Sequence, residues 1–168
     1  MLFPKNRFFD TGSLAAEMAY SQLLQVTAHP ELFKGVGYGA CRAVETPGVV
    51  GSGSKDDGCS SRHYAALALN FTPQWLQIGP SWDLDLPMSL NYGIKGNAAS
   101  AGGGSQGAAS WAVGAKFTYG QRHEFTLRYA DSFARPKYNA AGTTLLGGNG
   151  GVGNTDRGWL AFTYKTGF

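Results

Sequence analysis

The stretch Leu84-Asp85-Leu86-Pro87-Met88-Ser89-Leu90-Asn91-Tyr92-Gly93-Ile94 decides the fold, because large apolar residues occupy every second position in it. Successive side chains of a β-strand point to opposite faces of the sheet, so this period predicts a strand with one apolar and one polar face. The segment Ala109–Tyr119 repeats the pattern. Further segments with the same period lie at Leu14–Tyr20, Ala65–Phe71, Glu124–Ala130 and Trp159–Phe168. The sequence therefore predicts an all-β protein with about six long antiparallel strands.

The composition favours a membrane β-sheet over a soluble one. Charged residues make up 15% of the 168 residues, and glycine contributes 25 of them, whereas a soluble domain carries roughly 25% charged residues. No run approaches the roughly 18 apolar residues of a membrane helix, but strands of about 9–11 residues can cross a bilayer when tilted. Strands of soluble sandwiches average about five or six residues. The scattered lysines and arginines give no support to nucleic-acid binding. We therefore expect a segment of a transmembrane β-barrel.

The connections between the predicted strands alternate between long and short. Long connections span about 29–61, 96–105 and 134–156, and short turns lie near Gly79-Pro80 and Gly120-Gln121-Arg122. Outer-membrane barrels have long loops outside the cell and short turns in the periplasm. We therefore expect the chain to lie in the bacterial outer membrane, with its C-terminus on the periplasmic side.

The polar face of the predicted strands supplies the candidate functional residues. A charge on the lipid face costs ~2–4 kcal/mol at the middle of the membrane, so polar residues gather on the lumen side. These residues either hold the shape of the barrel or take part in solute passage. The residues expected to face the lumen are Glu17, Asn70, Asp85, Asn91, Lys95, Lys116, Glu124, Arg128, Arg157 and Lys165.

Catalytic and metal-binding patterns are not evident. Asp83 and Asp85 share a strand face, but they are about 7 Å apart along the strand, and the three histidines are far apart in the sequence. We expect no catalytic site, metal or cofactor here, although a barrel enzyme with its site outside this segment stays open. Cys41 and Cys59 lie in the first long connection. They are expected to form a disulfide if the chain is exported, and to be two free thiols if it is not.

The last predicted strand carries a candidate signal for membrane insertion. Leu160, Phe162, Tyr164 and Phe168 lie on one face of it, and Phe168 ends the chain. This pattern resembles the C-terminal signal of bacterial outer-membrane proteins that the barrel assembly machinery reads. Thr166 departs from the pattern, which usually has a hydrophobic residue at that position.

Several stretches resemble one family of membrane proteins. They are Leu14–Tyr20 with its Glu-x-x-Tyr, Trp82–Gly93 followed by Gly96-Asn97, and the hairpin segments Val113–Tyr119 and Leu127–Tyr129. The chain is similar here to the proteobacterial domain-of-unknown-function family 1302, which consists of large outer-membrane β-barrels. The resemblance implies a channel or conduit for solutes or poorly soluble compounds. It also implies outer-membrane lipid, a periplasmic lipid-handling protein and an RND-type transporter as partners.

The resemblance and the geometry together suggest a part of a longer protein. Six strands leave two open edges, and barrels of this kind start at eight strands. Residues 1–12 are expected to be an irregular lead-in and residues 13–168 the C-terminal part of a barrel. The first residues, Met1–Arg7, contain no apolar core of a signal peptide. The alternatives are a soluble β-barrel or sandwich that binds a small ligand, with the row Leu84, Leu86, Met88 and Leu90 facing a core, and a surface adhesin with glycine-rich binding loops.

Overall fold

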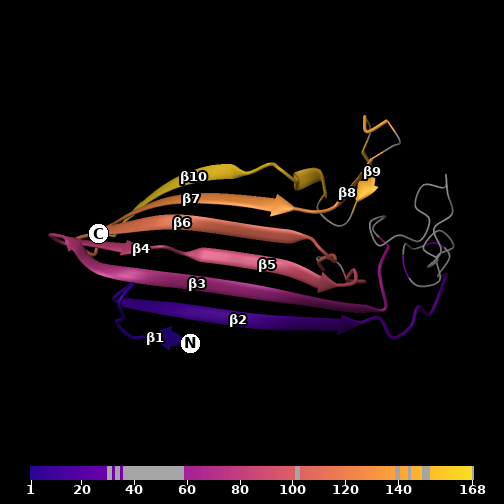
Figure 1. Ribbon diagram of the computed structural model, residues 1–168, viewed down its shortest axis with the longest axis horizontal. Helices are drawn as coiled ribbons and strands as arrows, with labels where there is room; N and C mark the ends of the chain where they lie inside the picture. The colour runs from indigo at the N-terminus through magenta and orange to yellow at the C-terminus, as the bar shows by residue number, and fades with distance from the viewer. Residues whose placement is uncertain are drawn as a thin grey trace.

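The computed structural model describes residues 1–29, 32, 35, 59–100, 103–138, 141–143, 145–148 and 152–167. Its main sheet is antiparallel and has eight strands (Figure 1). These are β1 (Leu2–Phe3), β2 (Thr11–Gln22), β3 (His63–Gly79), β4 (Trp82–Asp85), β5 (Met88–Lys95), β6 (Ala109–Tyr119), β7 (His123–Phe133) and β10 (Trp159–Thr166). The prediction of an antiparallel all-β protein is thus confirmed.

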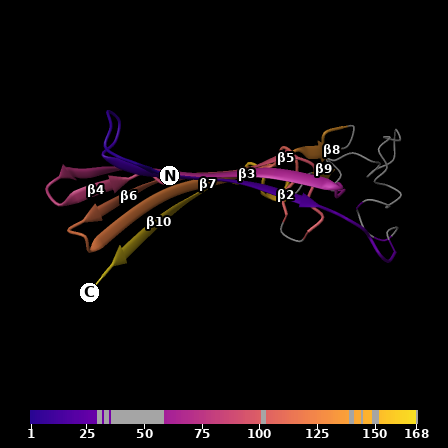
Figure 2. The same ribbon diagram turned by 90° about the horizontal axis from the view of Figure 1, so that it is seen from below.

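Neighbouring strands in the sheet follow one another along the chain. The order is β1-β2-β3-β4-β6-β7-β10, and β5 continues the line of β4 between β3 and β6. Seen edge-on, the strands form a single twisted layer (Figure 2). The outer edges of this layer are formed by β10 on one side and by β2, with the short β1 beside its first residues, on the other.

The predicted strand from Leu84 to Ile94 is interrupted at Leu86 and Pro87, which separate β4 from β5. Pro87 has no N–H to donate, so it cannot complete the ladder. The register continues in step across the break, because Asp85 pairs with Lys116 and Met88 pairs with Val113. Gly114 makes room for the proline ring, since a Cβ at Gly114 would lie 3.3 Å from Cγ of Pro87. The proline therefore removes a hydrogen bond without shifting the strand.

The two ends of the sheet differ, as the connection lengths predicted. One end holds the short turns β3–β4 and β6–β7, and the other holds the long connections (Figure 1). In the first turn Pro80 precedes Ser81, whose φ is 64°, an arrangement typical of type II turns. In the second, Gly120 and Gln121 have φ of 56° and 59°. The alternation of long and short connections is confirmed for the strands of the main sheet.

Two stretches expected to be irregular contain short strands. Within residues 1–12, β1 pairs with β2 at Leu2↔Ser13 and Phe3↔Gly12. Phe3 and Phe9 make edge-to-face contacts with Phe71, at centroid distances of 6.3 and 5.9 Å. In the connection before β10, β8 (Pro136–Tyr138) pairs with β9 (Leu145–Gly148), and the 3-10 helix η4 (Val152–Asn154) follows. Such short pieces give no periodic signal in the sequence.

Within the described residues, the sheet has no apolar core of the kind that a soluble sandwich needs. Among the described residues, the buried hydrophobic residues are Cys59, Ala112 and Ala134. Leu84, Leu86, Met88 and Leu90 are all partly exposed, so this row does not face a core. In the part of the chain that the structure describes, no helix is long and apolar enough to cross a membrane.

Candidate functional site

The strand register assigns the predicted lumen residues to faces of the sheet, because residues paired across antiparallel strands share a face. One row runs from Glu17 through Ala68, Asn91 and Ser110 to Ser132. The rows beside it continue the same face, which we call the polar face. The predicted residues that the register brings together on it are Glu17, Asn70, Asp85, Asn91, Lys116, Glu124, Arg128 and Lys165.

The other two predicted lumen residues lie outside this register. Arg157 precedes β10 and lines a cavity on the polar face together with Asn91 and Arg128. Lys95 follows a register shift, because Ala66 pairs with Gly93 whereas Ala65 pairs with Lys95. Lys95 is therefore opposite Ala65, in the row of Tyr20. Simple alternation placed Lys95 with Asn91, and this placement is wrong because the strand contains a β-bulge, which adds one residue.

The acidic residues of the polar face near the short turns form ion pairs or hydrogen bonds within the chain. Oδ2 of Asp85 lies 2.6 Å from Nζ of Lys116, and only 9% of the Asp85 side chain is exposed. Oε2 of Glu124 lies 3.9 Å from Nζ of Lys165. Asp83 accepts a hydrogen bond from the backbone N–H of Gln77. These contacts match a structural role for the acidic side chains.

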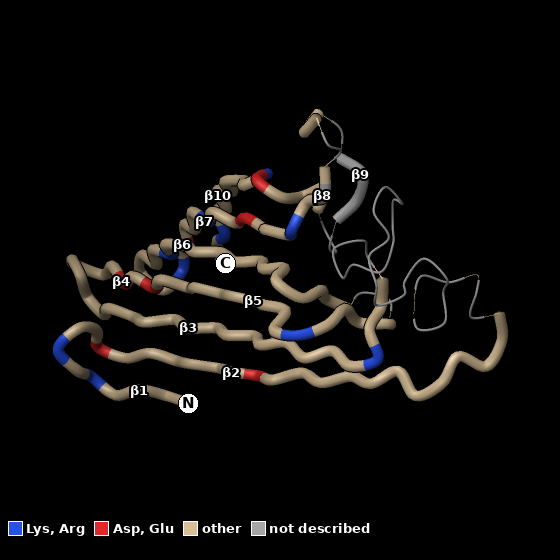
Figure 3. The backbone as a smooth tube through the Cα atoms, turned by 45° about the vertical axis from the view of Figure 1, so that its right-hand side comes forward, with Lys and Arg blue, Asp and Glu red and all other residues tan. Residues whose placement is uncertain are grey.

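The charged residues are distributed unevenly among the strands. Figure 3 shows β3 without any charged residue along its length, whereas β6, β7 and β10 carry several. In β6, β7 and β10 all of these except Asp131 lie on the polar face. Asp131 pairs with Trp111 near the long connections, and its carboxylate accepts a hydrogen bond from the N–H of Ser132.

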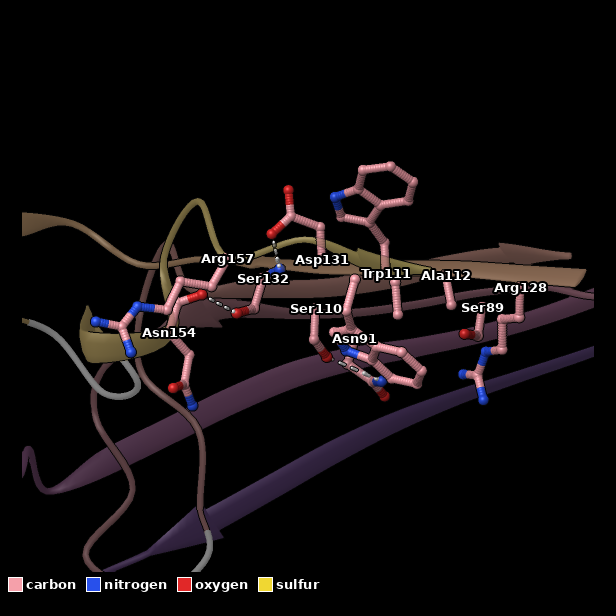
Figure 4. A pocket seen from close by; sticks show the side chains of 12 residues that line it. Ser89, Asn91, Ser110, Trp111, Ala112, Arg128, Asp131, Ser132, Asn154 and Arg157 are labelled. Carbon is pink, nitrogen blue, oxygen red and sulfur yellow. Dashed lines mark hydrogen bonds between the residues drawn. The ribbon is translucent and has the colours of Figure 1, made fainter. Parts of the chain in front are cut away.

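Two cavities lie over the polar face toward the long connections. The first, about 440 Å³, is lined mostly by small and polar residues of β5, β6 and β7 and by Arg157 and Trp159, and Trp111 and Asp131 also border it. In Figure 4, Asn91, Ser110 and Arg128 lie on one side of the sheet, and Trp111 and Asp131 point to the other. The second cavity, about 670 Å³, shares Asn91 and Ser110 with the first and extends to Glu17.

A segment of the connection between β5 and β6 covers the end of the polar face. A Cβ at Gly93 would overlap the carbonyl oxygen of Ser105, so the backbone at Ser105 lies directly on β5. Asn97 holds this connection, because its Nδ2 donates to the carbonyl of Cys59 at 2.8 Å and its Oδ1 accepts from the N–H of Gln106 at 3.1 Å. Asn97 is 4% exposed. The covering segment is therefore fixed by buried hydrogen bonds.

The opposite face, which we call the apolar face, exposes large hydrophobic side chains. Phe162 is 67% exposed, and Leu160 and Met18 are exposed to 65% and 76%. The three described residues of the predicted insertion signal, Leu160, Phe162 and Tyr164, all lie on this face. Phe168 lies outside the described residues. Exposed apolar patches larger than a few hundred Å² are uncommon on soluble monomers and mark an interaction surface.

Aromatic side chains gather at both ends of the apolar face. Near the short turns, Trp82 contacts Tyr119 at a centroid distance of 4.8 Å, and Phe125 stacks on Tyr164 at 5.0 Å. At the same end, Nδ1 of His123 is hydrogen-bonded to the hydroxyl of Tyr164 at 2.8 Å.

Toward the long connections, Trp111 and Tyr129 lie 5.4 Å apart. At the same end, Nδ1 of His63 is hydrogen-bonded to the hydroxyl of Tyr20 at 2.7 Å. The rows between the two ends are mostly aliphatic, as with Met18 and Leu67 or Ala115 and Leu127. This arrangement has the pattern of two aromatic girdles.

An ion pair holds the first turn of the chain at the short-turn end. Nζ of Lys5 lies 2.6 Å from Asp10, whose other carboxylate oxygen accepts the N–H of Leu76 at 3.0 Å. The hydrogen bond from Lys5 holds the pKa of Asp10 below its ordinary value, and the N–H of Leu76 adds to the effect. The same turn is tied to β3 by Trp75, whose indole N–H donates to the carbonyl of Phe8.

The cysteine and metal predictions can be followed only in part. Cys59 is buried, at 8% exposure, but Cys41 lies outside the described residues, so their pairing stays a prediction. Within the residues that the structure describes, no group of three or more His, Cys, Asp or Glu side chains is arranged to hold a metal ion.

Trp159 and Asn154 line the first cavity and were not among the predicted site residues. Trp159 pairs with Ala130 and so shares the polar face, although its side chain is an aromatic one. Alternation along the strand predicts this placement, because it puts Trp159 in one row with Ala161, Thr163 and Lys165. Asn154 lies in η4, and its carbonyl accepts a hydrogen bond from the hydroxyl of Ser132. No periodic pattern in the sequence indicates the position of Asn154, because the chain turns through an irregular connection before it.

The protein is thus of the antiparallel all-β class, with one polar face and one exposed apolar face. The family model described as "Protein of unknown function (DUF1302)" matches residues 4–168. The chain belongs to this family, as its resemblance in sequence predicted. Neither a curated protein nor a solved structure matches the chain.

Proposed function

We propose that the chain forms part of an outer-membrane β-barrel whose polar face lines a passage for solutes or poorly soluble compounds. The observation that carries this proposal is the exposed apolar face, which has no second layer over it in the described part of the chain. In a lipid bilayer these side chains would contact acyl chains, and the free-energy cost of exposing them to water would disappear. The polar face would then be on the aqueous side.

The strand edges support the same proposal. Among the described residues, the outer edge of β10 pairs with no other strand, and neither does β2 beyond its contact with β1. Unpaired backbone groups cost several kcal/mol each in a lipid environment, so membrane sheets close into barrels. Further strands, from the same protein or from another copy, would complete the ring. The barrel assembly machinery would insert it, and Leu160, Phe162 and Tyr164 would belong to the recognised strand.

The remaining partners follow from the family resemblance alone. A periplasmic lipid-handling protein and an RND-type transporter would work with the barrel if its cargo is poorly soluble. The chain would then act as a conduit and not as an enzyme. The soluble binding module is disfavoured because few hydrophobic residues are buried in the described part of the chain. The adhesin alternative concerns loops that lie mostly outside the described residues, and it stays a prediction.

Membrane location is tested with an antibody against the last dozen residues. Outer-membrane and soluble fractions are compared on gels, with and without boiling of the samples. The proposal predicts a band in the outer-membrane fraction whose migration changes on boiling, because folded barrels resist the detergent. A band in the soluble fraction that does not respond to boiling would contradict it and would support the soluble module.

Passage along the polar face is tested by the swelling of vesicles that contain the protein, with arabinose as the solute. Ser110→Trp places a large side chain in the first cavity, and we expect it to slow swelling several-fold. Val113→Trp adds a similar bulk on the apolar face and serves as the control. Equal rates for the two variants would contradict a passage along the polar face.

A further inference from the structure

The positive charges of the polar face fall into two groups. Lys116 and Lys165 are each paired with a carboxylate, at 2.6 and 3.9 Å. Arg128 and Arg157 are exposed, and within the described part of the chain neither guanidinium forms an ion pair. Of the described residues that line the same cavity, Asp131 is the one with a carboxylate, and Figure 4 shows its side chain on the other side of the sheet from Arg128. The two arginines can therefore receive an anion from solution.

The part of the cavity between the two arginines is lined by small side chains, several of them polar. Arg128 and Arg157 line the same cavity of about 440 Å³, whose floor includes Ser89, Ser110 and Ala112. Figure 4 shows the two arginines at opposite ends of this group, with Ser110 between them. Small side chains leave space above the sheet, and their hydroxyls can hydrogen-bond to a polar ligand.

Trp159 gives the cavity one large apolar surface. It pairs with Ala130 on the polar face, and its row continues through Ala112 and Ser89, which are both small. The side chain lines the cavity and is 53% exposed. An exposed indole within a polar surface is expensive to solvate, and its flat ring can stack on an aromatic ligand.

We propose that Arg128, Arg157 and Trp159 form a binding site for aromatic carboxylates that travel along the polar face. A guanidinium presents a planar fork of N–H donors that matches a carboxylate, and it keeps its charge at all physiological pH values. The indole selects for a flat apolar group next to the anion. The proposal rests on the proposed function, because a solute reaches this face through an aqueous interior.

The test is the binding of 2-naphthoate to the protein in detergent micelles, measured by equilibrium dialysis. The variants are Arg128→Gln and Arg157→Gln, and the matched control is Lys165→Gln, which removes a positive charge of the same face outside the cavity. We expect each arginine variant to weaken binding about tenfold or more, as the loss of a charge-assisted hydrogen bond does. The control should change affinity less than about twofold, in line with an exposed ion pair. The comparison between variants cancels the partition of naphthoate into micelles.

Trp159→Leu separates an aromatic carboxylate site from a general anion site. It should weaken the binding of 2-naphthoate and leave the weaker binding of inorganic phosphate unchanged. Arginine variants that bind naphthoate as well as Lys165→Gln does would overturn the proposal. Equal affinities of the intact protein for phosphate and naphthoate would overturn the role of the indole. Each variant is first checked for the change in gel migration on boiling, so that misfolding is recognised.

This test is independent of membrane insertion. Binding in micelles does not require a closed passage, whereas vesicle swelling does. Binding of naphthoate without vesicle swelling would support the binding site and contradict the proposed passage. Swelling without selective binding would support the passage and contradict the binding site.

Discussion

The two faces of this sheet differ in how their side chains find partners. On the polar face, Asp85 is neutralised by Lys116, Glu124 lies near Lys165, and a backbone segment at Ser105 folds onto Gly93. On the apolar face, side chains such as Phe162 and Leu160 remain largely exposed. On the polar face the carboxylates of Asp85 and Glu124 therefore have partners within the chain and Arg128 and Arg157 are open to a ligand, whereas the apolar face requires its partners from outside. In the proposed membrane location, lipid acyl chains would be these partners.

The largest effect is expected when a charged side chain is introduced on the apolar face and compared with the same change on the polar face. Phe162 and Thr163 are neighbours in β10 and lie on opposite faces. We expect Phe162→Arg to lower the free energy of unfolding from lipid vesicles by about 2–4 kcal/mol, because in the proposed membrane orientation the charge would enter the acyl-chain region. Thr163→Arg should change it by less than about 1 kcal/mol. Urea unfolding followed by tryptophan fluorescence measures both values, and equal effects would contradict the assignment of the faces.

The ion pairs of the polar face provide the next largest effect. Lys116→Met leaves the carboxylate of Asp85, whose side chain is 9% exposed, without its cation. We expect a loss of about 2–3 kcal/mol, somewhat below that of a fully buried pair because Lys116 is itself 34% exposed. Lys165→Met is the control, since that lysine is 76% exposed and 3.9 Å from Glu124. Its loss should stay below about 1 kcal/mol. A control loss as large as that of Lys116→Met would show that burial does not set the difference.

The covering segment on the polar face can be tested with a single methyl group. In Gly93→Ala the new Cβ overlaps the carbonyl oxygen of Ser105, so the segment must move. We expect a loss of about 1–3 kcal/mol in the free energy of unfolding, typical of overpacking. Gly153→Ala is the matched control, because nothing lies within 4 Å of its Cβ. Unchanged stability in Gly93→Ala would mean that the segment does not rest on the sheet.

The smallest effect concerns Asp10, at the short-turn end and outside both faces. Its pKa is lowered in the folded state by Lys5 and the N–H of Leu76. A lowered pKa means that the carboxylate stabilises the fold above its unfolded pKa of about 3.9, and that this contribution is lost as the pH falls through the folded value. We expect the stability difference between the protein and Asp10→Asn to vanish at pH values below the folded pKa of Asp10. A difference that persists there would contradict this role for the ionised carboxylate.

The period of two predicted most of this architecture from the sequence. It predicted the positions of the strands on either side of the turns at Pro80 and Gly120. It also predicted that Asp85, Lys116 and Arg128 lie on one face. It failed at Lys95, because a bulge adds one residue and changes which partner the next side chain meets. Bulges arise from the fit between two strands, so one strand alone does not reveal them.

The cavity on the polar face was less accessible to sequence reasoning. Arg128 was identified from its strand, but its position opposite Arg157 depends on how the irregular connection before β10 brings η4 back to the sheet. Alternation placed Trp159 on the polar face, yet composition gives no reason to separate this indole from the aromatic residues of the other face. Three-dimensional placement was needed to bring the three side chains together.

The most direct test of the central claim compares Trp111 on the apolar face with Trp159 on the polar face. Fluorescence of the protein in vesicles is quenched either by brominated lipid or by aqueous iodide, and the share of each tryptophan is obtained from Trp111→Phe and Trp159→Phe. The assignment of the faces predicts that Trp111→Phe removes much of the quenching by lipid and that Trp159→Phe removes much of the quenching by iodide. Quenching of both residues by iodide, with none by brominated lipid, would contradict a lipid-facing sheet.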